Sequence, residues 1–507
     1  MTDSGGTHLL SSARYTLHDL RRLVDERPRL GLAPDVRAQI EAGARYVQAR
    51  ATEDRYIYGV NTGYGALCET RIGVEHLEEL QRRHVLSHAC GVGPIVPERI
   101  SRLVMLVKLL TFRTGHTGIS VETVDRLLAH WNEGLIPTIP KRGTVGASGD
   151  LAPLAHMSLP LLGLGQVYMD GRVVPASEAL ARTGWAPLRL RAKEGLALTN
   201  GVQYINALAA SALMEIGDLV RCADVIASLS VQGFSAARLF YHPRYHETSF
   251  HEDRRIVAAN LGSLLDGSNH SELPTCNRST QDPYSFRCIP QVHGAIRQTL
   301  RFTWQVMEDE CNGVSDNPLF FPEEDLILTG GNLHGESTAF STDFLAIAVS
   351  ELANISERRT WQLLSGQRGL PSFLVANPGL DSGLMVVQYT SAALVNECKV
   401  LSTPASVDTI PTCQTQEDSV SMGGTSAYKL GQIVENCGTV LAIELLVAAQ
   451  ACDLNGGLRL SPTTRAIVDG LRQRVPFLSE DRLLADDIEA TRTFFAEHAR
   501  AWSTLVA

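Results

Sequence analysis

The sequence predicts a mainly α-helical protein in which a long-helix bundle core follows a smaller mixed α/β N-terminal domain. After residue 200, apolar residues recur with helical spacing over four segments that exceed ordinary helix length, 204–232, 290–312, 337–365 and 428–452. Before residue 200, shorter helical stretches alternate with Gly-rich loops. We therefore expect a mixed domain at 1–203 and a long-helix bundle with C-terminal helices at 204–507.

Single elements follow from local patterns. GQVYMDGRVVP, residues 165–175, alternates apolar and polar residues around Asp170-Gly171, which predicts a β-hairpin with a two-residue turn. In the third long segment, helical spacing places four apolar residues on one face, which we expect to be buried: Phe344, Ala348, Leu352 and Ile355.

Composition narrows the class of partner. The 507 residues are 44% hydrophobic, which is enough for a large buried core. Their formal net charge of -10 disfavours nucleic acid or an anionic membrane as the main partner and favours a small soluble substrate. The first ten residues lack the pattern of a secretory signal, and the apolar run at 440–451 is too short for a membrane span and contains Glu444. We expect a cytoplasmic protein. Ten cysteines without CxxC pairs or His/Cys clusters predict no zinc site and no disulfide framework, and we expect most of them to be buried thiols.

The segment 139–157, IPKRGTVGASGDLAPLAHM, is the most unusual stretch of the chain. It lacks the GxxxxGK[ST] pattern of a phosphate-binding loop, and it lacks the GxSxG pattern of a hydrolase nucleophile. A third interpretation is backbone cyclisation, in which the Gly149 nitrogen attacks the Ala147 carbonyl and Ser148 loses water. Small neighbours and a glycine nitrogen are what such a ring closure requires.

Eight motifs together resemble the histidine, phenylalanine and tyrosine ammonia-lyase and aminomutase family, and the resemblance runs from about residue 56 to 487. The motifs are YGVNTGYG (58–65), LSHACGVG (86–93), GTVGASGDLAPLAH (143–156), KEGLALTNG (193–201), QDPYSFRCIPQV (281–292), SDNPLFF (315–321), GGNLHGE (330–336) and TQEDSVSM (415–422). The resemblance implies a mostly helical fold and a homotetramer with composite active sites. It also implies a 4-methylidene-imidazol-5-one (MIO) group formed from Ala147, Ser148 and Gly149, with no external cofactor.

The resemblance also implies roles for single residues. Tyr58 matches the catalytic base, and we expect its surroundings to lower its pKa, since a phenol is a poor base at neutral pH. Asn200 and Tyr284 match residues that position the electrophile and the amine. Arg287 matches the arginine that binds the substrate carboxylate, for which a guanidinium fork is well suited.

Five residues bear on the substrate side chain. His88 follows Ser87 as in histidine lyases and some tyrosine aminomutases, and it could contact an imidazole or a phenol. Glu417 matches a glutamate of histidine lyases where aromatic lyases have glutamine, and a carboxylate accepts a hydrogen bond from imidazole N–H. Gln281 and Met385 also match the histidine-lyase pattern, whereas Leu333 stands where that pattern has phenylalanine.

Further positions depart from the same pattern. Thr415 replaces an asparagine and Val202 replaces a threonine, which should alter selectivity more than reaction type. The segment 237–256 is rich in His and Arg and lacks the expected Gly-Gln spacing, and we expect a solvated loop there.

The leading hypothesis is elimination of ammonia from L-histidine to give urocanate. An aminomutase acting on tyrosine, phenylalanine or histidine, or a tyrosine or phenylalanine ammonia-lyase, would use the same electrophile. A non-catalytic paralogue is the alternative from another class, although it would not need Tyr58, Ser148, Asn200 and Arg287 together.

Overall fold

The computed structural model describes residues 6–276 and 281–507, which group into two compact units. The first unit comprises Met1–Ser211, Trp304–Asp343 and Pro404–Tyr428, and the second unit comprises the remaining segments, Ala212–Thr303, Phe344–Thr403 and Lys429–Ala507. Each unit thus draws on three separate parts of the sequence. The expected domain boundary at residue 203 stays a prediction.

The first unit combines eight helices with short strands. The helices are α1 (Leu17–Glu26), α2 (Pro34–Ala51), α3 (Leu77–His88), α4 (Glu98–Phe112), α5 (Val121–Asn132), α6 (Leu151–Ser158), α7 (Ala176–Thr183) and α8 (Glu194–Thr199). Helix α4 is buried on all sides from residue 101 to 112, so it forms the centre of this unit.

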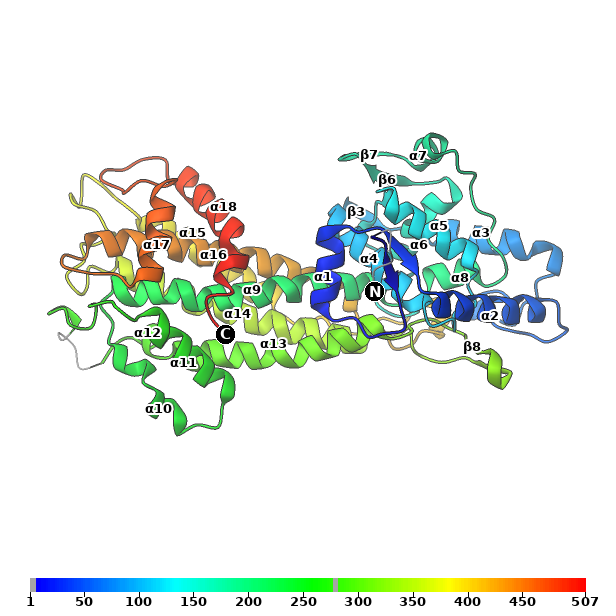
Figure 1. The fold of residues 1–507 in the computed structure, drawn as a ribbon, viewed down its shortest axis with the longest axis horizontal. Coiled ribbons are helices and arrows are strands. Elements are labelled where there is room, and N and C mark those ends of the chain that lie inside the picture. Colours follow the sequence, from blue (N-terminus) through cyan, green and yellow to red (C-terminus); the bar gives the residue numbers. More distant parts are fainter. Residues whose placement is uncertain (1–5, 277–280) are drawn as a thin grey trace. The chain divides into compact units, whose positions relative to one another are not determined.

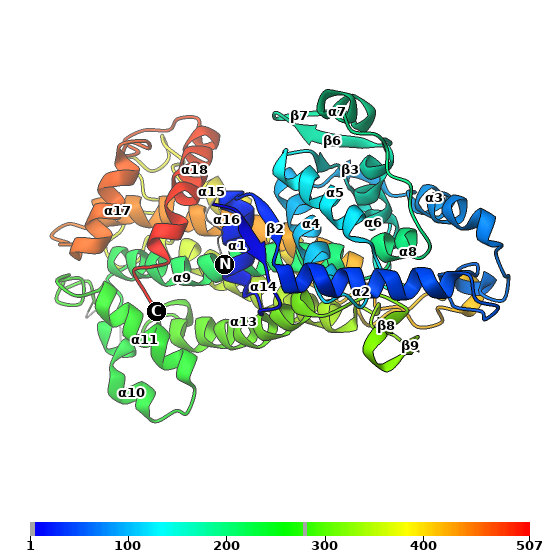
Figure 2. The same cartoon turned by 45° about the vertical axis from the view of Figure 1, so that its right-hand side comes forward.

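The strands of the first unit form small sheets of two or three strands. The strands are β1 (His8–Leu10), β2 (Leu30–Leu32), β3 (Val92–Ile95), β4 (Ile136–Pro137), β5 (Pro140–Arg142), β6 (Gln166–Met169), β7 (Arg172–Pro175), β8 (Leu319–Phe321) and β9 (Leu326–Leu328). Strands β6 and β7 pair antiparallel with Met169 opposite Arg172, which confirms the predicted hairpin, and α7 packs beside them (Figure 2).

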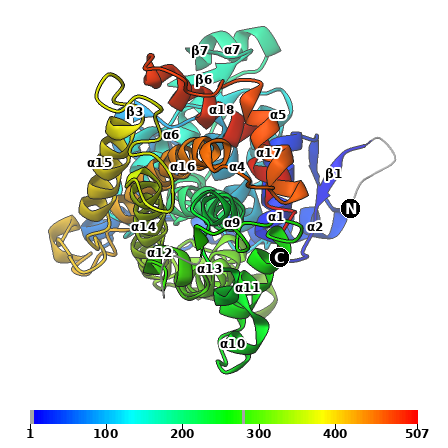
Figure 3. The ribbon, with the colours of Figure 1, turned by 90° about the vertical axis from the view of Figure 1, so that its left-hand side faces the viewer.

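Four long helices confirm the mainly α-helical prediction, and their ends lie within a few residues of the predicted ones. They are α9 (Gln203–Gly233), α13 (Ile289–Asn312), α14 (Glu336–Leu364) and α16 (Gly423–Leu454). Their portions within the second unit run side by side as a bundle (Figures 1 and 3). The other helices of this unit are α10 (Pro243–Glu247), α11 (Glu252–Leu264), α12 (Tyr284–Arg287), α15 (Met385–Leu401), α17 (Pro462–Arg472) and α18 (Leu484–Trp502).

A buried ion pair ties three of the long helices together. The Glu444 carboxylate on α16 accepts hydrogen bonds from Arg359 on α14 at 2.8 Å, from Ser356 at 2.6 Å and from Ser230 on α9 at 2.6 Å. Among the described residues, α16 alone is long and apolar enough to cross a membrane, but 78% of its most apolar window is buried inside the protein. Helix α16 is therefore a core helix of this fold.

Two local predictions were wrong in part. Leu352 and Ile355 on α14 are buried as predicted, but Phe344 is 45% exposed, because the buried face is centred on Leu345, Val349 and Leu352. The segment 237–256 is not a plain loop, because it contains a short 3-10 helix (Arg238–Tyr241), α10 and the start of α11. Proline at the first position of α10 and two acidic residues in the first turn of α11 favour these helical starts.

Candidate active site

The loop that carries Ala147-Ser148-Gly149 has an unusual backbone. Gly146, Ser148 and Gly149 all have positive φ angles, and the φ angle of +49° at Ser148 is uncommon for a non-glycine residue. Gly149 lies against Gly201, and a Cβ atom on Gly149 would come 2.1 Å from the Gly201 carbonyl oxygen. Only glycine fits at position 149.

Asp150 fastens this loop to the start of α9. Its carboxylate accepts the backbone N–H groups of Tyr204 and Ile205, both at 2.9 Å, and the Thr144 hydroxyl at 2.9 Å. Its own N–H donates to the Gly201 carbonyl at 2.7 Å. Complete burial raises the pKa of Asp150 to about 7. The loop is thus held by a hydrogen bond from the Asp150 N–H to the Gly201 main chain and by the interaction of the Asp150 carboxylate with the N-terminus of α9.

A cavity of about 480 Å³ opens beside the loop, and all the residues that line it belong to the first unit. Five residues predicted from the sequence line this cavity: Tyr58, His88, Ser148, Asn200 and Glu417. Ala147 and Gly149 are the chain neighbours of Ser148, and Ala147 is buried against Val420 and Met422.

Ser148 is held from two sides within the cavity. Its hydroxyl donates to the Glu417 carboxylate, and its carbonyl accepts a hydrogen bond from the Asn200 side-chain amide at 3.1 Å. The Asn200 side-chain oxygen is buried and has no hydrogen-bond partner among the described residues. It is therefore an acceptor available to a bound molecule.

Glu417 is presented by a tight turn. The Thr412 hydroxyl donates to its second carboxylate oxygen at 2.5 Å, and the Thr412 N–H donates to the Glu417 carbonyl at 2.9 Å. Between them Cys413, Gln414 and Thr415 all have positive φ angles. Because such a run of non-glycine residues is strained, the turn fixes the carboxylate rather than leaving it mobile. Thr415 itself is exposed and does not line the cavity.

The expectation of a lowered pKa for Tyr58 was wrong. Burial raises the pKa of the Tyr58 phenol, and the nearby charges of Cys413 and Glu417 act in the same direction. The Gly65 N–H donates to the phenol oxygen at 3.1 Å and opposes this shift, but it is the smaller effect.

His88 belongs to a stack of three rings at one wall of the cavity. The His84 ring lies 4.1 Å from the Tyr64 ring and 4.0 Å from the His88 ring. The Nδ1 atom of His88 lies 2.7 Å from the His84 carbonyl, so it donates a proton there. Burial lowers the pKa of His88, which favours the neutral ring with an unprotonated Nε2 atom.

The other predicted site residues do not line this cavity. Tyr284 and Arg287 form α12, which lies in the second unit, where the guanidinium sits 4.4 Å from the Tyr284 ring centre. Tyr284 is 69% exposed. Gln281 and Met385 also belong to the second unit, and Leu333 lies half-buried in the first unit.

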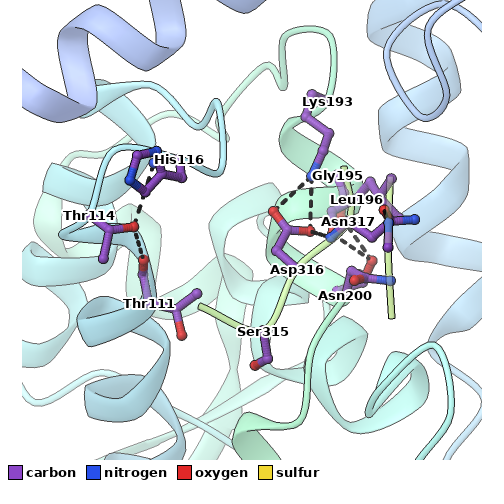
Figure 4. A network of polar contacts seen from close by, with 12 residues as sticks. Thr111, Thr114, His116, Lys193, Gly195, Leu196, Asn200, Ser315, Asp316 and Asn317 are labelled. Atoms are coloured by element: carbon purple, nitrogen blue, oxygen red, sulfur yellow. Dashed lines mark hydrogen bonds and ion pairs between the residues drawn. The ribbon is translucent and has the colours of Figure 1, made fainter. Parts of the chain in front are cut away.

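A buried polar network that reaches Asn200 escaped the sequence analysis (Figure 4). Lys193 points at Asp316 and donates to its two carboxylate oxygens at 2.9 and 2.8 Å, with both side chains fully buried. Lys108 on α4 donates to the Asn200 carbonyl at 2.6 Å. The signal in the sequence was a single lysine within the apolar run LVMLVKLL, which is a costly residue to bury without a purpose.

Comparisons with known proteins identify similar chains. A family model described as aromatic amino acid lyase matches residues 15–473. The chain is 46% identical over 479 residues to the histidine ammonia-lyase of Symbiobacterium thermophilum, covering 94% of each chain. Its fold is similar to the crystal structure of histidine ammonia-lyase from Trypanosoma cruzi, with a TM-score of 0.90 and 36% identity over 99% of this chain and 96% of the other.

The tyrosine aminomutase of Streptomyces globisporus is similar as well, with a TM-score of 0.90 and 34% identity over 98% of this chain and 97% of the other. The family model matches most of the chain, and several relatives are more than 40% identical to it over most of its length. The chain belongs to the aromatic amino acid lyase family.

Proposed function

We propose that this protein is a carbon–nitrogen lyase that eliminates ammonia from L-histidine to give urocanate. The observation that carries the proposal is the juxtaposition of Ser148, Asn200 and Glu417 in one cavity beside a loop that only glycine at position 149 can complete. Relatives named histidine ammonia-lyase, between 40% and 46% identical over most of the chain, support the same substrate.

The loop fits the MIO group that the family resemblance implies. Gly149 lacks the Cβ that would meet the Gly201 carbonyl at 2.1 Å, and Ser148 already has the left-handed backbone of a tight turn. The Asn200 amide donates to the Ser148 carbonyl at 3.1 Å, the oxygen on which an imidazolone would carry partial negative charge. When formed, this group supplies an electrophile that makes the substrate amine a better leaving group.

Formation of the group would also change Glu417. In the unmodified chain the Ser148 hydroxyl occupies one oxygen of the Glu417 carboxylate, while Thr412 occupies the other. Dehydration removes that hydroxyl, so one carboxylate oxygen becomes free to accept a hydrogen bond from the imidazole N–H of histidine. His88, with its unprotonated Nε2 atom, offers a second acceptor on the same cavity wall.

Tyr58 is the proposed base for the β-proton. Its phenol lines the same cavity as Ser148, which the role requires. Because burial raises its pKa, only a small fraction is ionised at neutral pH, and turnover should increase as the pH rises.

We also propose a homotetramer with composite sites. Tyr284, Arg287, Gln281 and Met385 do not line the cavity of the first unit, and the family resemblance implies sites that draw on several subunits, so a neighbouring subunit is the proposed source of these side chains. The second unit exposes several large apolar side chains that association would bury: Phe302, Phe344, Ile347, Trp361, Val386, Tyr389 and Val400. A cytoplasmic location, proposed from the sequence, is compatible with ten free cysteines.

Mixing two impaired variants tests the composite site. Tyr58→Phe and Arg287→Ala proteins should each have strongly reduced activity alone, but subunit exchange should restore some sites that carry both wild-type residues. Recovery of ammonia release in the mixture supports sites built from two chains, whereas a mixture no more active than its components contradicts them. Light scattering of each sample gives the oligomeric state.

The substrate is tested by incubating the purified protein separately with histidine, tyrosine and phenylalanine. Urocanate with stoichiometric ammonia supports the proposal. A β-amino acid without ammonia release would identify an aminomutase, the second candidate, which the similarity to tyrosine aminomutase favours. Mass spectrometry of the peptide with residues 147–149 completes the test, since an unmodified peptide excludes the self-made electrophile and favours a non-catalytic paralogue.

A further inference from the structure

Lys108 is a fully buried lysine at the centre of the first unit. It lies on α4, where residues 101–112 are all buried, and its Nζ atom has two hydrogen-bond acceptors and lies 5.2 Å from the Phe112 ring centre. Because burying such a group is costly unless it is hydrogen-bonded, its contacts indicate what it does. Lys108 does not line the cavity, so it does not touch the substrate.

The contacts of Lys108 converge on the residue that holds the electrophilic loop. Its Nζ atom donates to the Asn200 carbonyl at 2.6 Å and lies 3.4 Å from the Gln203 side-chain oxygen. Gln203 is itself fixed, because its amide nitrogen donates to Thr111 at 3.0 Å and to the Ser315 hydroxyl at 2.9 Å. Lys108 therefore holds the main chain of Asn200 without lining the cavity itself.

Asn200 transmits this restraint to the loop. Its side-chain amide donates to the Ser148 carbonyl at 3.1 Å, and the next residue, Gly201, accepts the Asp150 N–H at 2.7 Å. A Cβ atom on Gly201 would lie 2.1 Å from the Ser315 carbonyl, so this segment has no room to shift toward that side. The position of the Asn200 amide is thus set by the contacts of its own backbone.

We infer that Lys108 is a positioning residue of the active site, which holds the Asn200 backbone so that its side-chain amide stays directed at the Ser148 carbonyl. This role rests on the proposed function, since it matters only if the group formed at Ser148 takes part in turnover. The contact does not depend on the charge of Lys108. Burial lowers the pKa of Lys108 to about 7, but the ammonium and the amine both carry an N–H that can donate to Asn200.

A double-mutant cycle tests the inference on the full-length protein. The variants are Lys108→Met, Asn200→Ala and the double variant, with Leu110→Ala as the control for a buried change on the same helix. For each variant we would measure kcat and KM with histidine per modified chain, and Tm. We would also measure the fraction of the 147–149 peptide that is two water molecules lighter, one water coming from ring closure at the Ala147 carbonyl and one from the Ser148 hydroxyl.

Lys108→Met should lower kcat per modified chain by about 10- to 100-fold, because small misplacements of a catalytic group have effects of this size. KM should stay within about threefold of wild type, since Lys108 makes no contact with substrate. The double variant should be no slower than Asn200→Ala alone, because both changes remove the same restraint. Leu110→Ala should lower Tm and leave kcat unchanged.

Two results would overturn the inference. One is a double variant whose kcat falls by the product of the two single effects, which would mean that Lys108 does not act through Asn200. The other is a Lys108→Met protein with unchanged kcat per modified chain. If Lys108→Met does not fold, the same cycle with Lys108→Gln decides the question. An unmodified peptide in the wild-type protein overturns the proposed function itself, and is thus distinguishable from both results.

Discussion

Replacing Glu417 with glutamine is the change that best separates recognition of histidine from the elimination step. The glutamate and glutamine side chains have the same shape, so the substitution leaves the cavity volume unchanged. It removes the negative charge and one of two acceptor oxygens. When the one amide oxygen of the variant accepts from the Thr412 hydroxyl, which donates to Glu417 at 2.5 Å, the amide NH₂ group takes the place of the second oxygen and presents a donor instead of an acceptor to an imidazole N–H.

The size of the effect follows from these contacts. A hydrogen bond to a charged acceptor is worth about 1.5–3 kcal/mol, against about 1 kcal/mol for a neutral one. We therefore expect Glu417→Gln to weaken binding of the imidazole ring by about 2 kcal/mol, or about 30-fold. A phenyl ring has no N–H to donate, so its binding should change by less than about threefold.

Product inhibition measures this difference without requiring turnover of both amino acids. Against wild type, the inhibition constant of urocanate should rise about 30-fold in Glu417→Gln, while that of cinnamate stays nearly constant. Thr412→Val is the matched control, because it removes a neighbour of the carboxylate but keeps the charge. Equal changes for urocanate and cinnamate would refute the assignment of Glu417 to the imidazole ring.

Three further predictions concern the loop, the base and the buried network. Gly149→Ala should leave the 147–149 peptide unmodified, because the alanine Cβ would lie 2.1 Å from the Gly201 carbonyl oxygen. The value of kcat should fall by more than about 1000-fold. A peptide two water molecules lighter in this variant would contradict the role of Gly149. For wild type, kcat/KM should increase from pH 7 towards pH 10, because the base must be deprotonated and burial raises the pKa of Tyr58. The Tyr58→Phe variant should not show this increase, and its rate should be about 10²- to 10⁴-fold lower. A pH-independent wild-type rate over this range would argue against Tyr58 as the base. Lys193→Met should lower the free energy of unfolding by about 3–5 kcal/mol in denaturant titration, because it leaves the Asp316 carboxylate buried without its cation. The double variant Lys193→Met/Asp316→Leu should recover most of that loss, and a double variant as unstable as the single one would show that packing rather than charge is responsible.

Much of the fold could be predicted because its signals are local. The 3.6-residue spacing of apolar side chains predicted α9, α13, α14 and α16, and Asp170-Gly171 predicted the turn between β6 and β7. The orientation of α14 was harder to predict. Phe344 is apolar but exposed, while the charged Arg359 is buried on the same helix, because Glu444 on another helix neutralises it. Such pairing joins residues 85 positions apart and leaves no local pattern in the sequence.

Some features of the candidate site could likewise be predicted from the sequence, and others could not. Ser148, Asn200 and Glu417 could be recognised because each stands in a motif, and the structure brings them into one cavity. The pKa of Tyr58 could not be predicted, because its direction depends on how completely the folded chain excludes water from the phenol. The backbone N–H of Gly65 was a reasonable source of stabilisation for a phenolate, but desolvation is the larger effect.

Four ionisable side chains are buried around the loop of residues 147–149, and their hydrogen bonds explain why the backbone around this loop is rigid. Lys108, Lys193, Asp150 and Asp316 are all fully buried, and they balance in sign. Each holds a different piece of backbone: Asp150 caps α9, Lys108 holds Asn200, and the Lys193–Asp316 pair joins the start of α8 to the segment that follows Ser315. An apolar core of equal volume would be less costly to bury, but it would not specify the direction of single hydrogen bonds. A cyclisation that brings an amide nitrogen onto a carbonyl two residues away demands that direction, so we interpret the polar surround as the part of the fold that fixes the geometry of residues 147–149.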